Sequence, residues 1–470
     1  MVDSRHGKSS FVVVANRLPV DRVEAQDGSS TWRRSPGGLV TALDPVMRNN
    51  QGAWIGWAGA AEENPDPFED EGTWLVPVPL TEQDIEAYYE GFSNATLWPL
   101  YHDVIAQPTF RRDWWESYRQ VNQRFAEATA EVADSDALVW VHDYQLQLVP
   151  EMLRALRPDL RIGFFLHIPF PPGELYARLP WRRALLRGLL GADLVGFQRP
   201  GAANNFLRLC RVFLGVQTYR DRALLTDGRI VRASAFPISI DVAGVESRAR
   251  NPATEQRAAE IREEIGNPNK VLLGIDRLDY TKGIAERVGA YNELLDEGEI
   301  TADDAAFVQI ATPSRERIEQ YQLMRDEVEL AVGRVNGNHG RIGRPAVTYL
   351  HTTFDRNELV ALYRAADVMV VTPLRDGMNL VAKEYVASRF DHSGVLLLSE
   401  FAGAADELKQ ATLANPYDVD GLKQALLEAI RLDPQEASRR MRSMRRYLVD
   451  HDVDHWAGSF LKALTGESTP

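Results

Sequence analysis

The feature that most constrains the fold of this chain is the alternation of short apolar runs with helical segments. In the first half, apolar runs of strand length are separated by helical patterns such as residues 114–133 and 145–156. This alternation predicts βαβ units and a mostly parallel, doubly wound sheet. The apolar runs that we predict to be strands are residues 11–15, 53–57, 137–141, 162–167 and 194–197, followed in the second half by 271–275, 306–310, 347–350, 368–371 and 395–398.

The chain length predicts two domains. At 470 residues the chain exceeds the roughly 250–300 residues beyond which a single hydrophobic core stops growing. A polar, helix-prone stretch, residues 241–270, separates the two series of strands, so we place the boundary near residue 240. The predicted fold class is α/β, with two Rossmann-like domains, residues 1–240 and 241–450, that face each other across a substrate cleft.

The net charge and the cysteine content indicate which ligands the protein can bind and in which cellular compartment it functions. The formal net charge of −14 argues against general nucleic-acid binding, but it permits phosphorylated ligands, which local Arg and Lys clusters recognise. The single cysteine, Cys210, excludes an internal disulfide framework and fits a reducing cytoplasm. The sequence contains no run of 18 apolar residues and no cleavable leader pattern, so we predict a cytoplasmic protein without a membrane span.

Two cationic loops in the second half predict a diphosphate site. Residues 372–384 follow an apolar strand, pass through a Pro/Gly turn and reopen as a helix, whose first N–H groups form an anion site. Residues 274–283 follow another strand and supply Arg277, a planar fork for phosphate oxygens, and Lys282, a compact point charge. Either loop alone is an ordinary strand-to-helix connection, but the pair predicts a diphosphate clamp.

Polar residues also follow strands in the first half, where ligands of doubly wound sheets bind. Asn16 and Arg17 follow the first strand, and residues 35–39 contain glycines that allow a ligand to approach the backbone closely. His142 and His167 follow two further strands. A lone histidine at a strand end is more often structural than catalytic. These loops therefore indicate a binding site only in combination with the phosphate loops of the second half.

Several ordered segments of the chain match one known family. They are Asn16-Arg17, residues 36–39, 92–99, 140–144, 163–171 and 276–283, and the loop 375–384. In these segments the chain resembles the trehalose-6-phosphate synthases, a family of retaining glycosyltransferases with the two-Rossmann-domain GT-B architecture. The match covers essentially the whole chain, which makes it far more specific than a short motif. By analogy with this architecture, the amphipathic tail, residues 451–470, is expected to be a helix that returns to the first domain.

The resemblance implies an activity and assigns one substrate to each domain. Glucose would pass from a nucleotide-glucose to the anomeric hydroxyl of glucose 6-phosphate, giving α,α-trehalose 6-phosphate with retention at the donor carbon. Residues 1–240 would bind the acceptor, and residues 241–450 would bind the donor. The donor-binding residues carried over by position are Gly37 and Gly38 along the donor, Arg277, Lys282, Leu380 and Val381 at its diphosphate, Phe354 near its base, Glu384 at its ribose, and Asp376.

The same resemblance implies catalytic and acceptor-binding residues. The catalytic residues are His167, Asp376, Arg277 and Lys282, of which the first two face the transferred glucose. The acceptor-binding residues are Arg17 and Arg315 at the phosphate, Tyr89, Trp98 and Asp143 around the sugar, and either Trp54 or Trp57. No metal and no cofactor is implied, because cationic side chains and backbone amides can neutralise the departing diphosphate.

Two other functions stay open at this point. One is a relative with the same donor site but another phosphorylated acceptor, such as a glucosylglycerol-phosphate synthase. The other is a non-catalytic sugar-phosphate sensor built on the same fold. Arg17 and Arg315 disfavour acceptors without a phosphate, and a sensor would be expected to lack donor-site residues such as Lys282. The sequence leaves the choice among UDP-, ADP- and GDP-glucose open, and we expect a homo-oligomer.

Overall fold

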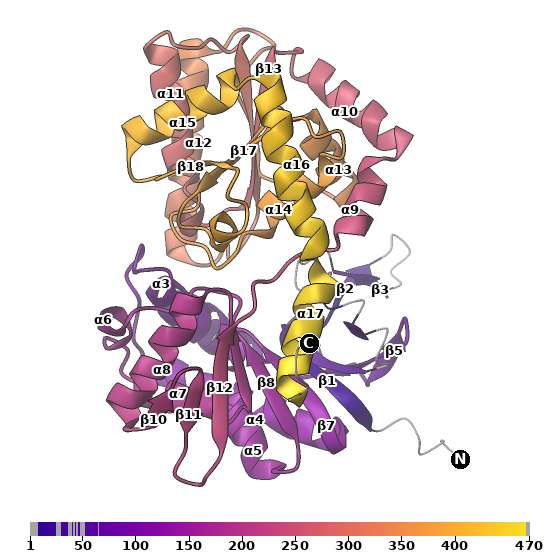
Figure 1. Ribbon diagram of the computed structural model, residues 1–470, viewed down its shortest axis with the longest axis vertical. Coiled ribbons are helices and arrows are strands. Elements are labelled where there is room, and N and C mark those ends of the chain that lie inside the picture. The colour runs from indigo at the N-terminus through magenta and orange to yellow at the C-terminus, as the bar shows by residue number, and fades with distance from the viewer. Residues whose placement is uncertain are drawn as a thin grey trace. The chain divides into compact units, whose positions relative to one another are not determined.

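A computed structural model of the chain describes residues 8–24, 30–35, 40, 43, 46–47, 52–63 and 65–466. The chain forms two compact units (Figure 1). The first unit comprises Met1–Ile238 together with Asp454–Pro470, and the second comprises Ser239–Val453. Each unit has its own sheet and its own set of helices.

The first unit is built on a sheet whose central strands are parallel. Its strands are β1 (Ser9–Arg17), β4 (Ala53–Trp57), β5 (Phe68–Asp70), β6 (Thr73–Pro77), β7 (Ala133–His142), β8 (Arg161–Phe165), β9 (Leu194–Phe197), β10 (Gln217–Tyr219), β11 (Arg222–Leu224) and β12 (Ile230–Ala235). Within the described residues their order is β10-β11-β12-β9-β8-β7-β1-β4-β6-β5, with antiparallel pairing at the two edges. The strand order reverses between β1 and β7, which creates a switch point at their carboxyl ends.

A hairpin and several helices complete the first unit. The hairpin pairs β2 (Val20–Glu24) with β3 (Ser30–Arg34). The described helices are α2 (Glu82–Asp84), the π-helix η1 (Ile85–Leu97), α3 (Trp98–Tyr101), α4 (Arg112–Val132), η2 (Tyr144–Leu146), α5 (Val149–Leu156), α6 (Gly173–Tyr176), α7 (Arg182–Leu190), α8 (Pro200–Leu214) and α17 (Val453–Thr465). The sequence patterns did not predict the π-helix, a rare form that is frequent at functional sites.

Helix α17 packs on the sheet of the first unit (Figure 1). The ring of Phe460 stacks on Trp140 with 4.5 Å between centres, and the ring of Trp456 lies 5.1 Å from that of Trp140. Gly163 in β8 and Gly196 in β9 make room for this contact, because a Cβ at either position would lie 2.7 Å from the Phe460 ring. The apolar face of the tail is therefore buried against β8 and β9.

The second unit contains an all-parallel sheet. Its strands are β13 (Lys270–Arg277), β14 (Ala305–Thr312), β15 (Val347–Leu350), β16 (Val368–Val371), β17 (Val395–Ser399) and β18 (Thr412–Ala414). Their order is β15-β14-β13-β16-β17-β18, which is the 3-2-1-4-5-6 order of a dinucleotide-binding sheet. The helices are α9 (Val242–Ala249), α10 (Pro252–Glu264), η3 (Tyr280–Lys282), α11 (Ile284–Asp296), α12 (Glu319–His339), α13 (Arg356–Ala365), α14 (Leu380–Ser388), η4 (Gly403–Asp406), α15 (Val419–Arg431) and α16 (Pro434–Asp450).

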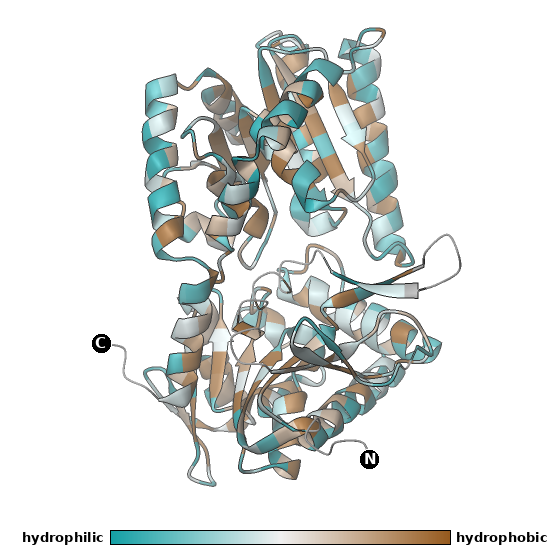
Figure 2. Ribbon diagram, turned by 90° about the vertical axis from the view of Figure 1, so that its right-hand side faces the viewer, coloured by the Kyte–Doolittle hydropathy of each residue, from teal (hydrophilic) through white to brown (hydrophobic). Residues whose placement is uncertain are grey.

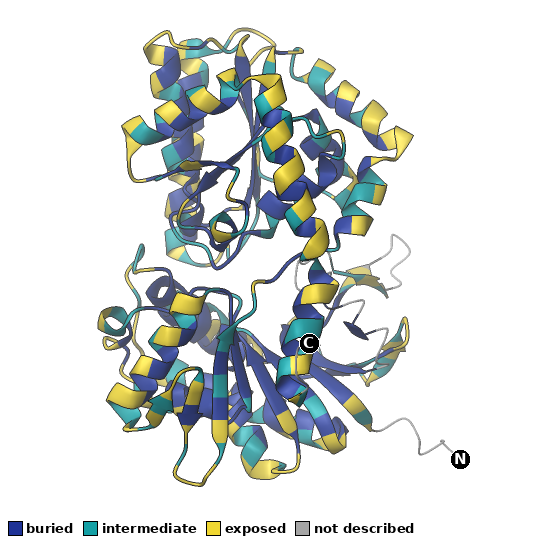
Figure 3. Ribbon diagram, viewed as in Figure 1, coloured by how far each residue is buried: buried dark blue, intermediate teal, exposed yellow. Residues whose placement is uncertain are grey.

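The strands form the core of each unit. Hydrophobic residues concentrate in the sheets, and polar residues on the outer helix faces (Figure 2). The strands are correspondingly buried, whereas the helices expose their outer faces (Figure 3). Parallel strands covered on both faces require continuous apolar runs, which explains why these strands were recognisable in the sequence. Among the described residues, no helix combines the length and apolar character needed to cross a membrane.

Each predicted strand is present, with small differences in its ends. Strands β4, β9, β15 and β16 have the predicted bounds. Strand β8 ends at Phe165, two residues earlier than predicted, so His167 lies in the loop beyond it. Strands β2, β3, β5, β6, β10, β11, β12 and β18 were not predicted. For β5, β10, β11 and β18, three residues are too few to show an alternating pattern.

Candidate active site

The switch point of the second unit brings the two cationic loops together. Strands β13 and β16 are parallel neighbours, so the loops that follow them lie at the same edge of the sheet. The Nζ atom of Lys282, after β13, lies 2.6 Å from the carboxylate of Asp376, after β16. Both side chains are mostly buried, with exposed fractions of 11% and 15%. The structure therefore places a cation and a carboxylate in direct contact where a nucleotide binds in sheets of this order.

Asp376 also organises the turn that opens α14. Its carboxylate accepts hydrogen bonds from the backbone N–H of Met378 at 3.3 Å and from the side-chain amide of Asn379 at 3.2 Å. Asn379 has a φ of 81° and caps α14 with its side-chain oxygen. A non-glycine residue at positive φ carries backbone strain, which concentrates at functional sites. Leu380 and Val381 lie in the first turn of α14, where backbone N–H groups have no partner within the helix and can bind an anion.

Arg287 on α11 joins the two loops from inside the unit. It is fully buried, and its guanidinium donates to the backbone oxygens of Lys282, Gly283 and Val370 at distances between 2.6 and 3.3 Å. It also forms an ion pair with Asp276 at 2.7 Å. Gly283 has a φ of 62°, and a Cβ there would collide with the backbone of the loop after β16. The backbone that carries Lys282 is therefore held in one conformation.

Glu384, on α14, is held by a buried tyrosine. The hydroxyl of Tyr363, on α13, donates to Oε2 of Glu384 at 2.9 Å. Burial raises the pKa of the Glu384 carboxyl, and the hydrogen bond from Tyr363 and the charge of Arg356 oppose that rise. The Glu384 carboxyl is thus partly buried, and one strong donor orients it.

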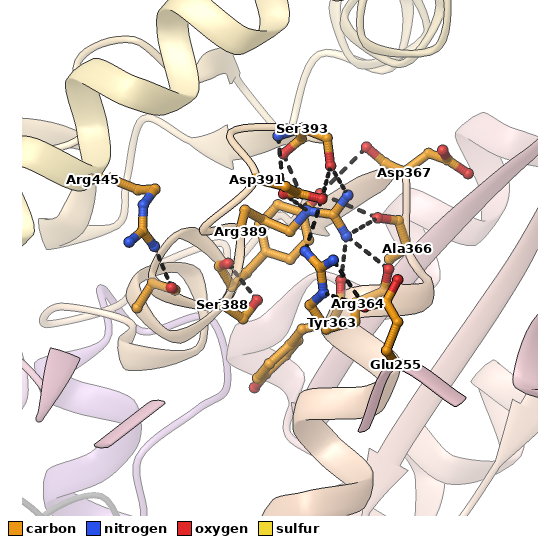
Figure 4. A network of polar contacts seen from close by, with 12 residues as sticks. Glu255, Tyr363, Arg364, Ala366, Asp367, Ser388, Arg389, Asp391, Ser393 and Arg445 are labelled. Atoms are coloured by element: carbon orange, nitrogen blue, oxygen red, sulfur yellow. Dashed lines mark hydrogen bonds and ion pairs between the residues drawn. The ribbon is translucent and has the colours of Figure 1, made fainter. Parts of the chain in front are cut away.

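The carboxyl end of α14 is anchored by two arginines (Figure 4). Arg389 donates to the backbone oxygens of Tyr363 and Ala366 at 3.1 and 3.2 Å, and so caps α13 as well. Arg445, on α16, donates to the backbone oxygen of Ala387. Guanidinium groups satisfy the last carbonyl groups of a helix and complement its dipole. Helix α14 is consequently fixed at both ends.

Arg315, in the loop after β14, contacts the loop after β13 through one carboxylate. Its side chain is 4% exposed, and it donates to Oδ2 of Asp279 at 3.0 Å and to the hydroxyl oxygen of Tyr321. The Tyr321 hydroxyl donates to the same Asp279 oxygen at 3.0 Å. The other oxygen of Asp279 accepts from the backbone N–H of Thr281 at 2.9 Å. Burial raises the pKa of Asp279, but nearby cations, Arg315 foremost, bring it to about 2. Arg315 also has a positive φ, 51°.

The remaining predicted donor residues differ in how well the structure defines them. Arg277 is exposed at the end of β13, and Phe354 is half-buried in the loop between β15 and α13. Gly37 and Gly38 lie outside the described residues.

Within the described part of the chain, no group of three or more His, Cys, Asp or Glu residues is arranged to hold a metal ion.

In the first unit, a cationic and aromatic group gathers at the end of β1. The guanidinium of Arg17 lies 5.0 Å from the centre of the Trp57 ring and forms an ion pair with Asp21 at 2.8 Å. The ring of Tyr89, on the π-helix, lies 5.9 Å from that of Trp57. Trp54, which lies on β4 as Trp57 does, is buried and donates to the backbone oxygen of Arg17 at 2.9 Å. Trp57 is therefore the tryptophan beside the Arg17 guanidinium.

A second group lies at the ends of β7 and β8. Asp143 has a φ of 74°, and its Oδ1 accepts from the backbone N–H of His167 at 3.2 Å. Nε2 of His167 lies 3.0 Å from Nδ1 of His142. Burial lowers the pKa of His167 to about 3 and that of His142 well below its usual range. Trp98 is buried, with its ring 5.6 Å from that of Tyr144.

Sequence reasoning assigned no individual role to Asp279, Asn379, Tyr363 or His142, although each contacts a predicted site residue. Asp279 and Asn379 directly precede helical turns and cap them, a position that Asx residues favour, so capping rules could have identified both. Tyr363 carries no such local signal, and His142 only its position at the end of a strand. Their contacts join separate elements of the fold.

Two Rossmann-like units, each with polar side chains at a switch point, are the architecture of the GT-B glycosyltransferases, and solved structures of that class share the fold of this chain. The chain matches Glycosyltransferase family 20 over residues 9–466, and it belongs to this family. The family and fold class predicted from the sequence are therefore confirmed.

Relatives with assigned activities cover nearly the whole chain. The chain is 59% identical to the trehalose-6-phosphate synthase of Mycolicibacterium gilvum, over 97% of this chain and 94% of the relative. The structure of a UDP-forming α,α-trehalose-phosphate synthase from Burkholderia xenovorans in complex with glucose-6-phosphate is 34% identical, with a TM-score of 0.89 and coverage of 97% and 100%. An E. coli structure bound with UDP-2-fluoro glucose is 35% identical, with a TM-score of 0.88 and coverage of 98% and 99%.

Proposed function

We propose that this chain transfers glucose from a nucleotide-glucose to the anomeric hydroxyl of glucose 6-phosphate, forming α,α-trehalose 6-phosphate with retention at the donor carbon. The observation that carries the proposal is the contact between Lys282 and Asp376 at the switch point of the second unit, which sets a phosphate-binding cation beside a carboxylate suited to sugar hydroxyls. Similarity to trehalose-6-phosphate synthases along nearly the full chain supports the same reaction. Among the nucleotides we favour UDP, because a related E. coli structure binds UDP-2-fluoro glucose.

In this proposal residues 241–450 bind the donor. Arg277 and Lys282 hold its diphosphate together with the backbone amides that open α14. Glu384 accepts the ribose hydroxyls, and Phe354 lies near the base. The supporting geometry is the fixed position of α14, which is capped at its start and anchored by arginines at its end. The complete proposed donor set is Gly37, Gly38, Arg277, Lys282, Phe354, Asp376, Leu380, Val381 and Glu384.

Residues 1–240 bind the acceptor, and the helix within residues 451–470 completes that domain. Arg17 holds the acceptor phosphate together with Arg315, which Asp279 and Tyr321 orient. Trp57, not Trp54, is proposed to line the acceptor site, because its ring lies 5.0 Å from the Arg17 guanidinium and 5.9 Å from the ring of Tyr89. The proposed residues around the acceptor sugar are Tyr89, Trp98 and Asp143.

The leaving group is stabilised by preorganised cations. As the bond between the anomeric carbon and the β-phosphate oxygen breaks, negative charge grows on that oxygen. Donors already aimed at this position stabilise the transition state, and loss of one typically costs on the order of 10² to 10³ in rate. Lys282 suits this role because Arg287 holds its backbone and Asp376 holds its ammonium group. The cationic side chains supply this stabilisation without a metal ion.

Retention follows from substitution on one face of the sugar. The departing phosphate oxygen accepts the proton of the acceptor hydroxyl, and the new C–O bond forms on the face that the phosphate leaves. No covalent enzyme intermediate is needed. Burial lowers the pKa of His167 to about 3, which makes its imidazole too weak a base to take that proton. His167 instead orients the glucose as a neutral group, and Asp376 binds its hydroxyls.

A product assay tests the proposal. Purified protein is incubated with UDP-, ADP- or GDP-glucose and glucose 6-phosphate, with glucose and glycerol 3-phosphate as alternative acceptors. We expect a disaccharide phosphate whose two anomeric carbons are both α, formed fastest from UDP-glucose. Faster transfer to glycerol 3-phosphate would establish the alternative acceptor, and binding without any transfer would establish a sensor. Light scattering on the same sample tests the expected homo-oligomer.

A further inference from the structure

His142 lies beside His167 but has no role in the proposed reaction. It ends β7, is fully buried, and places its Nδ1 atom 3.0 Å from Nε2 of His167. We infer that His142 is a positioning residue, whose Nδ1–H donates to Nε2 of His167 and thereby keeps the proton of the His167 ring on Nδ1. Its effect on turnover rests on the proposed function, whereas the hydrogen bond itself does not.

The main chain of His167 is already held on both sides. Its N–H donates to Oδ1 of Asp143 at 3.2 Å, and its carbonyl oxygen accepts from Nε2 of Gln198 at 3.3 Å. Gln198 is fixed in turn, because its Oε1 accepts from the backbone N–H of Ile238 at 3.0 Å. The freedom that remains is rotation of the imidazole ring, and His142 is the hydrogen-bond partner of that ring.

Aromatic side chains flank the histidine pair. The ring of His142 lies 4.7 Å from that of Trp140, and the ring of His167 lies 4.7 Å from Phe165 and 6.2 Å from Trp456 on α17. Burial lowers the pKa of both histidines, so both are neutral at pH 7. A hydrogen bond between two neutral imidazoles needs one ring as donor and the other as acceptor.

Nε2 of His142 decides which ring donates. This atom is buried and has no hydrogen-bond partner within the described residues. If His167 were the donor, His142 would carry its own proton on Nε2 as an orphaned buried N–H group, which protein interiors rarely contain. If His142 donates, Nε2 carries only a lone pair, which interiors tolerate more readily. The geometry therefore favours donation from His142.

This arrangement determines which atom His167 offers to a ligand. Its Nε2 is occupied by His142, so the ring proton lies on Nδ1. His167 is only partly buried, and within the described part of the chain its ring is hydrogen-bonded through Nε2, to His142. The result is a neutral N–H donor of fixed direction, which is suited to a sugar hydroxyl and unsuited to proton abstraction.

Neutron diffraction from crystals of the wild-type protein exchanged into D₂O measures the tautomers directly. We expect deuterium on Nδ1 of both His142 and His167. Deuterium on Nε2 of His167 would overturn the proposal. This measurement requires no catalysis, so it tests the hydrogen bond independently of the proposed reaction. Failure of the proposed reaction would appear in a different assay, as absence of product from the wild-type protein.

Two variants of nearly equal shape separate positioning from packing. His142→Leu removes the donor, whereas His142→Asn keeps an amide N–H at the δ position. We expect His142→Leu to lower kcat roughly 3- to 10-fold, the effect of one hydrogen bond, with little change in either KM. His142→Asn should recover most of kcat. Equal losses in both variants, or an unchanged kcat in His142→Leu, would refute positioning. The neutron measurement decides the question if the Leu variant does not fold.

Discussion

Replacing Tyr363 with Phe should make nucleotide binding more sensitive to acid while changing it little at pH 8. The Tyr363 hydroxyl donates to Oε2 of Glu384 at 2.9 Å, and the tyrosine is otherwise packed in the core with 1% exposed. In the proposed function Glu384 accepts the ribose hydroxyls, which favours its ionised form. Removing the hydroxyl therefore alters the protonation of the carboxyl without removing a ligand contact.

The sign and size of the effect follow from this hydrogen bond. Burial raises the pKa of Glu384 and the Tyr363 hydroxyl lowers it, so the pKa rises further in the variant. Affinity that requires the carboxylate is present above the folded-state pKa and is lost as pH falls through it. In Tyr363→Phe this loss begins at a higher pH. A bond to a charged group contributes about 1.5–3 kcal/mol, and solvent access to Glu384 argues for the lower value. The variant should therefore bind about tenfold more weakly at the acid end of the profile.

Calorimetric titration with UDP between pH 8 and pH 5 measures this difference. Tyr385→Phe is the matched control, because Tyr385 is equally buried but donates to the backbone oxygens of Asp367 and Ala366 at 3.3 and 3.5 Å. We expect the control to follow the wild-type profile. Parallel profiles for wild type and Tyr363→Phe would show that Glu384 does not bind the nucleotide as a carboxylate, or that Tyr363 does not tune it.

Three further predictions concern the charges around the donor and the acceptor. Lys282→Ala should lower kcat by on the order of 10² or more while weakening UDP-glucose binding less, because the negative charge on the departing diphosphate grows in the transition state. An unchanged kcat in steady-state assays would show that Lys282 only binds the substrate. Arg315→Ala should raise the KM for glucose 6-phosphate roughly tenfold or more with little change in donor binding. Equal losses of affinity for both substrates would show that Arg315 is not specific to the acceptor. EDTA should leave the rate intact, because Arg277 and Lys282 neutralise the diphosphate, and inactivation that only Mg²⁺ or Mn²⁺ reverses would contradict this.

The strands and the loops that follow them could be predicted because both depend on local sequence. Residues 368–371 form β16 as predicted, and residues 271–275 form β13 with short extensions. Because parallel strands have their carboxyl ends at one edge of the sheet, the loops after these two strands must share that edge. The sequence alone therefore predicts that Lys282 and Asp376 lie at the same edge of the sheet, whereas their direct contact depends on the adjacency of β13 and β16.

Other features could not be read from local patterns. The π-helix that carries Tyr89 depends on how its buried residues pack, since its composition is compatible with an ordinary α-helix. The backbone strain at Asp143, Arg315 and Asn379 also has no sequence signature beyond the tolerance of Asp and Asn for positive φ. Such conformations persist because the surrounding structure imposes them.

Local sequence specifies two series of βαβ units, the apolar cores of their sheets, and the chemical types of side chain at the strand ends. Tertiary packing selects which of those side chains meet. His142 and His167, Asp279 and Arg315, and Tyr363 and Glu384 are 25, 36 and 21 residues apart, and each pair joins different elements. Their contacts depend on strand order and helix packing, which arise from burial of the whole sheet. A local pattern of apolar and polar residues specifies which face of an element is buried, but not which neighbour will cover it.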